Sequence, residues 1–183
     1  GGKPKIDKCT EQEGFKLTPS KLRKAITKKT KWLILNSPSN PTGAGYTKKE
    51  IEELAKVLIK NKKVHILSDD IYEHIKYDNF NFYTIAQNSK LKDRTLTMNG
   101  VSKSYAMTGW RIGYILSANP EAMSQMTKLQ YYITACSNDA MQHAVLAAFE
   151  QANDYPDEMC IEFKARRDLI CSRLNAMPGV QCH

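Results

Sequence analysis

The segment VSKSYAMTGWRIG (residues 101–113) places a lysine and an arginine eight positions apart, at Lys103 and Arg111. A lysine amine can clamp a phosphate, form a Schiff base with an aldehyde, or simply lie exposed in solvent. An arginine guanidinium offers a bidentate fork that suits a phosphate dianion. The hydroxyl of Ser102 and the close backbone approach that Gly100 permits add to this pattern. The neighbours of Lys103 therefore favour a binding site over an ordinary exposed lysine.

A lysine that forms a Schiff base, beside an arginine that holds a phosphate, describes a site for pyridoxal 5′-phosphate (PLP). That cofactor also requires a carboxylate at its pyridine nitrogen, because the protonated ring is the electron sink for a carbanion. Asp69, at the end of an apolar run, is the candidate. In the alternative interpretation, Asp69 or Asp70 only caps a following helix.

Elements of two kinds alternate along the chain and would position these residues. Short apolar runs predict strands over residues 32–35, 64–67, 95–98 and 111–116. Capping signals and helical spacing predict helices that begin at Pro19, after Thr47 (ending near Asn61), near Pro120, near Asp139 and near Pro156. Residues 77–94 have no clean period and are expected to form a loop with short turns. This alternation predicts a three-layer α/β domain with a largely parallel sheet.

Ligands of such sheets bind outside the carboxyl ends of the strands. Polar side chains follow three of the predicted strands. Asn40 follows the first strand, Asp69 and Tyr72 follow the second, and Lys103 follows the third. Three loops at one edge of a sheet can converge on one ligand.

Three motifs together resemble the class I aminotransferases of PLP fold type I, and the bacterial aspartate aminotransferase branch in particular. They are NSPSNPTG (36–43), SDDIYE (68–73) and VSKSYAMTGWRIG (101–113). The resemblance extends over essentially the whole chain. It implies the α/β/α large domain of that fold, with a mainly parallel sheet, in incomplete form.

The resemblance also implies a role for each site residue. Lys103 would form the Schiff base with PLP and carry the proton between the substrate α-carbon and the cofactor. Asp69 would pair with the pyridine nitrogen, Tyr72 and Asn40 would hydrogen-bond the phenolic oxygen, and Arg111 would hold the phosphate.

Two further expectations come from the resemblance. The peptide bond before Pro41 is expected to be cis, which would suit a sharp turn that brings Asn40 to the cofactor ring. Relatives often carry a phosphate-binding serine three positions before the lysine, where this chain has Gly100. Ser102 is the residue that we expect to substitute for that serine.

The implied activity is transfer of an amino group between aspartate and 2-oxoglutarate. Alternatives within the fold type are an aromatic or prephenate aminotransferase, a lyase or a decarboxylase. A further alternative is a transcriptional regulator whose aminotransferase-like domain binds PLP without turnover, and a winged helix-turn-helix upstream would identify that class.

The chain is expected to be a piece of a longer protein, because it begins on Gly-Gly without Met and stops just after a Pro-Gly turn. Residues 1–155 would form the central part of the large domain, and residues 156–183 a long helix that leads into a truncated small domain. The full-length protein is expected to be a homodimer. The chain alone is expected to bind PLP poorly and not to transaminate.

Composition excludes several other classes. The sequence of 183 residues has no apolar run long enough to span a membrane and no apolar signal segment, which favours a cytoplasmic protein. Its five cysteines include no C-x-x-C pair and its four histidines are scattered, so neither a disulfide framework nor a metal site is expected. The net charge of +8 belongs to residues 1–63, which hold 16 Lys/Arg against 6 Asp/Glu. These lysines fall on helix-like segments, and solvated helix faces explain them better than nucleic-acid binding.

Overall fold

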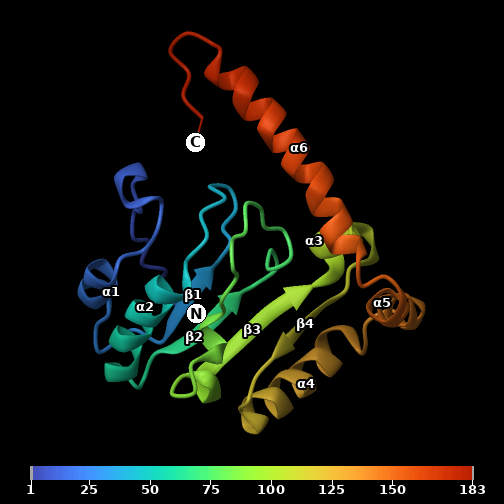
Figure 1. The fold of residues 1–183 in the computed structure, drawn as a ribbon. Coiled ribbons are helices and arrows are strands. Elements are labelled where there is room, and N and C mark those ends of the chain that lie inside the picture. The colour runs from blue at the N-terminus through green and yellow to red at the C-terminus, as the bar shows by residue number, and fades with distance from the viewer. Residues whose placement is uncertain (1, 183) are drawn as a thin grey trace.

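A computed structural model describes residues 2–182, which form one four-stranded sheet and six α-helices (Figure 1). The strands are β1 (Trp32–Asn36), β2 (His65–Asp69), β3 (Thr95–Gly100) and β4 (Gly113–Leu116). The helices are α1 (Pro19–Ala25), α2 (Lys48–Lys60), α3 (Val101–Ser104), α4 (Pro120–Thr134), α5 (Asp139–Gln151) and α6 (Tyr155–Asn175). Between β2 and β3 the chain forms turns and two short 3-10 segments, as predicted for residues 77–94.

The strand order is β1-β2-β3-β4, with β1, β2 and β3 parallel and β4 antiparallel to β3. The prediction of a mixed α/β fold with a mainly parallel sheet is confirmed. In this register Asn36 lies opposite Asp69, and Asp69 lies opposite Met98. The last residues of three strands therefore meet at one edge of the sheet, which places the segments that follow them side by side.

Two helices begin where local capping chemistry predicted. At α1 the side chain of Thr18 accepts a hydrogen bond from the backbone of Lys21, and Pro19 occupies the first helical position. At α2, Thr47 and Glu50 form a reciprocal capping box that satisfies two free backbone N–H groups. The α2 helix ends at Lys60 with Asn61 as its C-cap, also as predicted.

The fourth strand is shorter than predicted. It begins at Gly113, whereas the sequence indicated a strand from Arg111. Arg111 has a φ of 56°, in the left-handed region, which cannot continue an extended strand. The pattern of side chains over residues 111–116 did not predict this turn, because the pattern is strand-like and the turn lies in the backbone of a single residue.

The core lies between α1, α2 and one face of the sheet. Its buried side chains come from both helices, from β1 and β2, and from the residues between β2 and β3; they include Leu22, Leu35, Ile51, Leu54, Leu58, Ile66 and Ile85. The opposite face is open at β1, where Trp32 is 48% and Ile34 is 69% exposed. Among residues 2–182, no helix covers this part of the sheet on that face.

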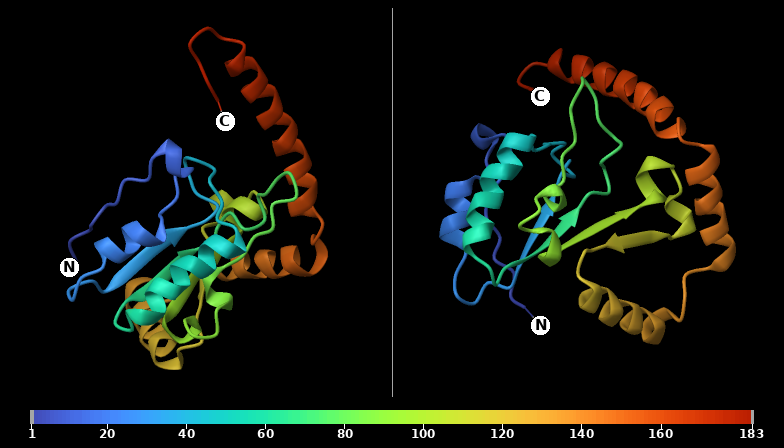
Figure 2. Two further views of the ribbon diagram at one scale, coloured as in Figure 1. Left: turned by 60° about the vertical axis from the view of Figure 1, so that its left-hand side comes forward. Right: turned by 60° about the horizontal axis from the view of Figure 1, so that its bottom comes forward.

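The C-terminal helices follow β4 as predicted, and they lie on the β4 side of the sheet in Figure 1. The α5 helix packs through Phe149, whose ring centroid lies 5.6 Å from that of Tyr105 and 6.3 Å from that of Tyr114. The α6 helix extends beyond the sheet and carries the chain to its C-terminal turn, as the left view of Figure 2 also shows. None of the helices within residues 2–182 is both long and apolar enough to cross a membrane.

Candidate active site

The predicted site residues lie at the carboxyl ends of β1, β2 and β3. Asp69 is the last residue of β2, and Lys103 follows the end of β3 by three positions. Asn40 follows the end of β1 by four positions. Because these strands are parallel neighbours, the sheet brings all three segments to the edge at which ligands of α/β sheets bind.

Lys103 lies in α3, a single helical turn directly after β3, and not in an irregular loop. Two side chains of this turn are buried: Val101 is fully buried, and Ser104 is 4% exposed. Lys103 itself is half-buried, and its Nζ lies 5.9 Å from the centroid of the Tyr72 ring. This separation falls within the range of a cation–π contact. The structure thus brings together two of the predicted site residues from different strand ends.

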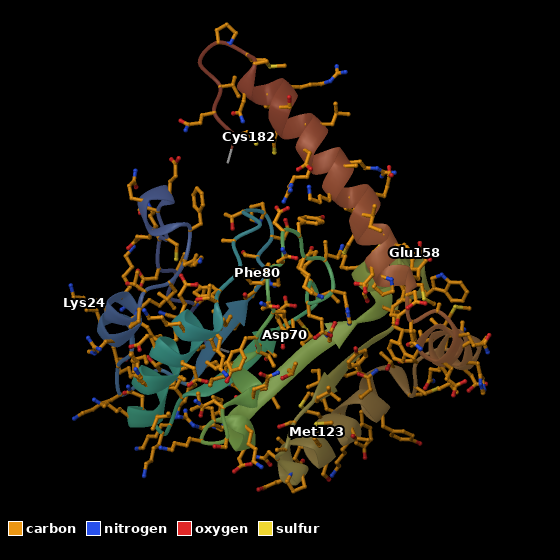
Figure 3. The ribbon with its side chains drawn as sticks, viewed as in Figure 1. Lys24, Asp70, Phe80, Met123, Glu158 and Cys182 are labelled. Atoms are coloured by element: carbon orange, nitrogen blue, oxygen red, sulfur yellow. The ribbon has the colours of Figure 1, made fainter. Side chains whose placement is uncertain are left out.

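Asp69 and Asp70 lie in different environments. Asp69 is half-buried, and its Oδ1 accepts a hydrogen bond from the backbone N–H of Ile71 at 3.3 Å. Asp70, labelled in Figure 3, is 3% exposed and accepts a hydrogen bond from the hydroxyl of Ser68 at 2.7 Å. Burial raises the pKa of the Asp70 carboxyl, and the hydroxyls of Thr84 and Ser68 oppose that rise.

The two aspartates also differ in their relation to the segment that follows β2. Turns follow β2, so neither carboxylate caps a helix there, although Asp69 does bond the first turn. Asp70 is engaged with hydroxyl groups inside the fold. Asp69 is therefore the carboxylate that remains accessible at the edge of the sheet.

Asn36 connects the first two strand ends, and sequence reasoning missed this role. Its Nδ2 donates to the carbonyl oxygen of Asp69 at 3.0 Å, and its Oδ1 accepts from the backbone N–H of Asn40 at 3.1 Å. Asn40 is exposed. The peptide bond before Pro41 is cis, as predicted, and the bond between Ser37 and Pro38 is cis as well.

Arg111 is joined to α3 through Thr108. The Nη1 of Arg111 donates to the carbonyl oxygen of Thr108 at 3.1 Å, and the hydroxyl of Thr108 donates to the carbonyl oxygen of Ser102 at 2.9 Å. Arg111 is exposed and Ser102 is half-buried. The guanidinium is therefore tied, through one intervening residue, to the helical turn that carries Lys103.

Glu73 and Asn99 form a second link between strand ends that sequence reasoning missed. The Nδ2 of Asn99 donates to the Glu73 carboxylate at 2.5 Å, and its Oδ1 accepts from the backbone N–H of Gly100 at 2.7 Å. A hydrogen bond from His74 lowers the pKa of Glu73 more than burial raises it. The places of these residues in the sequence could have indicated their roles. Asn36 is the first residue of NSPSNPTG, Glu73 is the last residue of SDDIYE, and Asn99 directly precedes Gly100.

The tight spacing of β3 and β4 explains the glycine three positions before Lys103. A Cβ added at Gly100 would lie 3.0 Å from the carbonyl oxygen of Ile112 and 3.1 Å from the Cα of Gly113. The φ of Gly100 is 174°, which any residue can adopt. Space between the strands, and not backbone conformation, therefore favours glycine here.

Two other features lie outside this site. A cavity of about 570 Å³ lies between residues 2–5 and β1, and none of the predicted site residues lines it. Within residues 2–182, no three His, Cys, Asp or Glu side chains are grouped so that they could hold a metal ion.

Comparison with known proteins gives a consistent result. The family model for aminotransferase class I and II matches residues 1–183. The aspartate aminotransferase of Rhizobium meliloti (strain 1021) is 47% identical over 183 residues, which are 99% of this chain and 44% of that protein. A probable aspartate/prephenate aminotransferase of Rickettsia typhi (strain ATCC VR-144 / Wilmington) is also 47% identical, over 100% of this chain and 46% of that protein.

The fold agrees with these sequence matches. The crystal structure of the aspartate aminotransferase from Rhizobium meliloti superimposes with a TM-score of 0.96 and 46% identity, over 100% of this chain and 46% of that one. The chain thus spans less than half of the length of the relatives that it matches. Because the family model and these alignments extend over the whole of its length, this chain belongs to the class I and II aminotransferases.

Proposed function

We propose that this chain supplies the cofactor-binding part of an enzyme that transfers an amino group between an L-amino acid and a 2-oxo acid with the aid of PLP. Aspartate and 2-oxoglutarate are the proposed substrates. The observation that carries the proposal is the approach of Lys103 to Tyr72 beside the end of β2, where Asp69 presents its carboxylate. The names of the relatives support it, since they are aspartate and aspartate/prephenate aminotransferases.

The donor set at the carboxyl edge fits PLP. It offers a primary amine, a carboxylate, a phenol, an amide and a guanidinium, from Lys103, Asp69, Tyr72, Asn40 and Arg111. Each group complements one part of the cofactor, namely the aldehyde, the pyridine nitrogen, the phenolic oxygen and the phosphate. When bound, PLP supplies the electron sink that stabilises a carbanion at the substrate α-carbon.

Each residue would act through an ordinary property of its side chain. The ionised carboxylate of Asp69 would keep a proton on the ring nitrogen, because an opposite charge favours the protonated base. Tyr72 and Asn40 would donate hydrogen bonds to the phenolic oxygen. Arg111 would hold the phosphate through charge-assisted bonds, and Ser102 would add a hydroxyl group.

Lys103 would have two tasks at one atom. Its Nζ would hold the cofactor covalently in the resting enzyme, and after release it would accept and return the proton of the substrate α-carbon. The short helical turn around Lys103 suits this use, because buried Val101 and Ser104 fix the backbone while the lysine side chain stays half-buried.

The substrate-gripping half of the site would come from the rest of the protein. We infer that residues 1–155 form the central part of a large domain and that residues 156–183 lead into a small one. The full protein would be a cytoplasmic homodimer, and the 183-residue chain alone would be inactive. An aromatic or prephenate aminotransferase is the second candidate, because the Rickettsia typhi relative is named for prephenate as well as aspartate.

The test uses the full-length protein and reduction with borohydride. The enzyme is first incubated with PLP, reduced, digested and examined by mass spectrometry for a pyridoxyl group. We expect the group on Lys103 and on no other lysine. A parallel sample is mixed with aspartate or an aromatic amino acid, and the change in cofactor absorbance identifies the amino donor. A pyridoxyl group on a different lysine would refute the assignment.

A further inference from the structure

Two of the cysteines lie side by side near the C-terminal end of α6. The thiol of Cys182 donates to the sulfur of Cys171, and the two Sγ atoms are 3.5 Å apart. Both residues are half-buried, and both are in the reduced form. Figure 3 labels Cys182 in the segment that turns back toward α6. The sequence predicted no disulfide framework, and these two cysteines, with ten residues between them, match no cysteine motif.

Asn175 holds the returning segment in place. Its Nδ2 donates to the carbonyl oxygen of Cys182 at 3.0 Å, and its Oδ1 accepts from the backbone N–H of Cys182 at 2.7 Å. This pair of bonds satisfies both backbone groups of Cys182. The turn itself is closed by Gly179, which has a φ of 76° that L side chains rarely adopt. The proximity of the two thiols is therefore built by specific contacts.

We propose that Cys171 and Cys182 are a redox modification site, at which a reversible disulfide joins α6 to the segment that follows it. A low-molecular-weight disulfide such as oxidised glutathione is the oxidant. One cysteine thiolate attacks a glutathione sulfur, forms a mixed disulfide and releases one glutathione thiolate. The second cysteine then attacks the protein sulfur of that mixed disulfide, and the second glutathione thiolate leaves. The two cysteines are oxidised by two electrons, and one glutathione disulfide is reduced to two thiols.

The disulfide would fix the direction in which the chain leaves α6. Residues 176–181 are exposed. Local backbone hydrogen bonds shape their turn; for example, the N–H of Val180 donates to the carbonyl oxygen of Met177 at 3.2 Å. A covalent bond between residues 171 and 182 would close this turn and restrict the freedom of the segment. The other cysteines have different surroundings; for example, Cys160 donates to the carbonyl oxygen of His74 at 3.0 Å.

The experiment oxidises the folded full-length protein with oxidised glutathione, blocks the remaining thiols with N-ethylmaleimide in acid, and digests with trypsin. Trypsin cuts after Arg173, which lies between the two cysteines, so a disulfide leaves residues 168–173 linked to the peptide that begins at Leu174. We expect this linked pair as the main oxidised product. It should vanish on reduction and in both Cys171→Ser and Cys182→Ser, and it should persist in the control Cys160→Ser.

A second variant tests whether the fold creates the proximity. Asn175→Ala removes both bonds to Cys182, and we expect the linked pair to form several-fold more slowly, because the effective concentration of the two thiols falls. Stable mixed disulfides with glutathione, two unreacted thiols, or links between subunits on a non-reducing gel would overturn the proposal. An unchanged rate in Asn175→Ala would also count against it.

Discussion

The side chain of Asn36 is bonded to the backbone of Asp69, with 3.0 Å between the Nδ2 of Asn36 and the carbonyl oxygen of Asp69. The Oδ1 of the same side chain accepts a hydrogen bond from the backbone N–H of Asn40 at 3.1 Å. One half-buried asparagine therefore sets the position of two proposed cofactor ligands relative to each other. Parallel pairing of β1 and β2 alone would fix the strands but not the loop that carries Asn40.

We expect Asn36→Ala to weaken PLP binding. The substitution removes two hydrogen bonds, each worth about 1 kcal/mol, and so lowers cofactor affinity roughly five-fold if half of the loss appears in binding. Absorbance titration of the full-length protein with PLP measures the affinity. The exposed Asn153→Ala, in the turn between α5 and α6, is the control. Equal PLP affinity in wild type and Asn36→Ala would contradict the positioning role.

Lys103→Ala should remove the proton transfer and the covalent attachment together. General acid–base catalysis contributes about 10²–10⁴-fold, so turnover of the full-length enzyme should fall by at least that factor. Noncovalent PLP binding should largely remain, because Asp69, Tyr72 and Arg111 are intact. Single-turnover kinetics measures the loss, with the exposed Lys128→Ala on α4 as control. Near-normal turnover of Lys103→Ala would contradict the proposed role of Lys103.

Glu73 should give the fold a stability term that depends on pH. Its pKa is lowered in the folded state, chiefly by the hydrogen bond with His74 and also by Asn99. A carboxyl with a depressed folded pKa stabilises the fold above its unfolded pKa, and that contribution is lost as the pH falls through the folded pKa. We therefore expect Glu73→Gln to cost about 1 kcal/mol near pH 6 and less near pH 3.

Urea unfolding at several pH values between about 3 and 6 measures this difference in the free energy of unfolding. The control is Glu150→Gln, because Glu150 is exposed on α5. A cost for Glu73→Gln that stays constant, or that grows as the pH falls, would show that the Glu73 charge does not stabilise the fold in this way.

Gly100→Ala should destabilise the junction of β3 and α3. The new Cβ would lie 3.0 Å from the carbonyl oxygen of Ile112, so β3 and β4 would have to separate slightly. Overpacking of this kind costs about 1–3 kcal/mol. Gly109→Ala is a matched control, because a Cβ there would meet nothing within 4 Å. Equal free energies of unfolding for the two variants would show that the strands can yield at no cost.

The sequence by itself determined the features that depend on near neighbours. Thr18 with Pro19, and Thr47 with Glu50, predicted the starts of α1 and α2, because a cap is made by residues within one turn of each other. The three motifs likewise predicted the family, since each is continuous in the chain. Alternating apolar runs and helical periods were sufficient for a mixed α/β fold.

Only the tertiary structure decided the features that depend on distant residues. The left-handed turn at Arg111 and the crowding at Gly100 follow from how β4 returns beside β3. The bond from Asn36 to Asp69 spans 33 positions, and the thiols of Cys171 and Cys182 meet where Asn175 bonds the returning segment. Such contacts are set by strand register and by the path of the chain between elements, which no local pattern of side chains encodes.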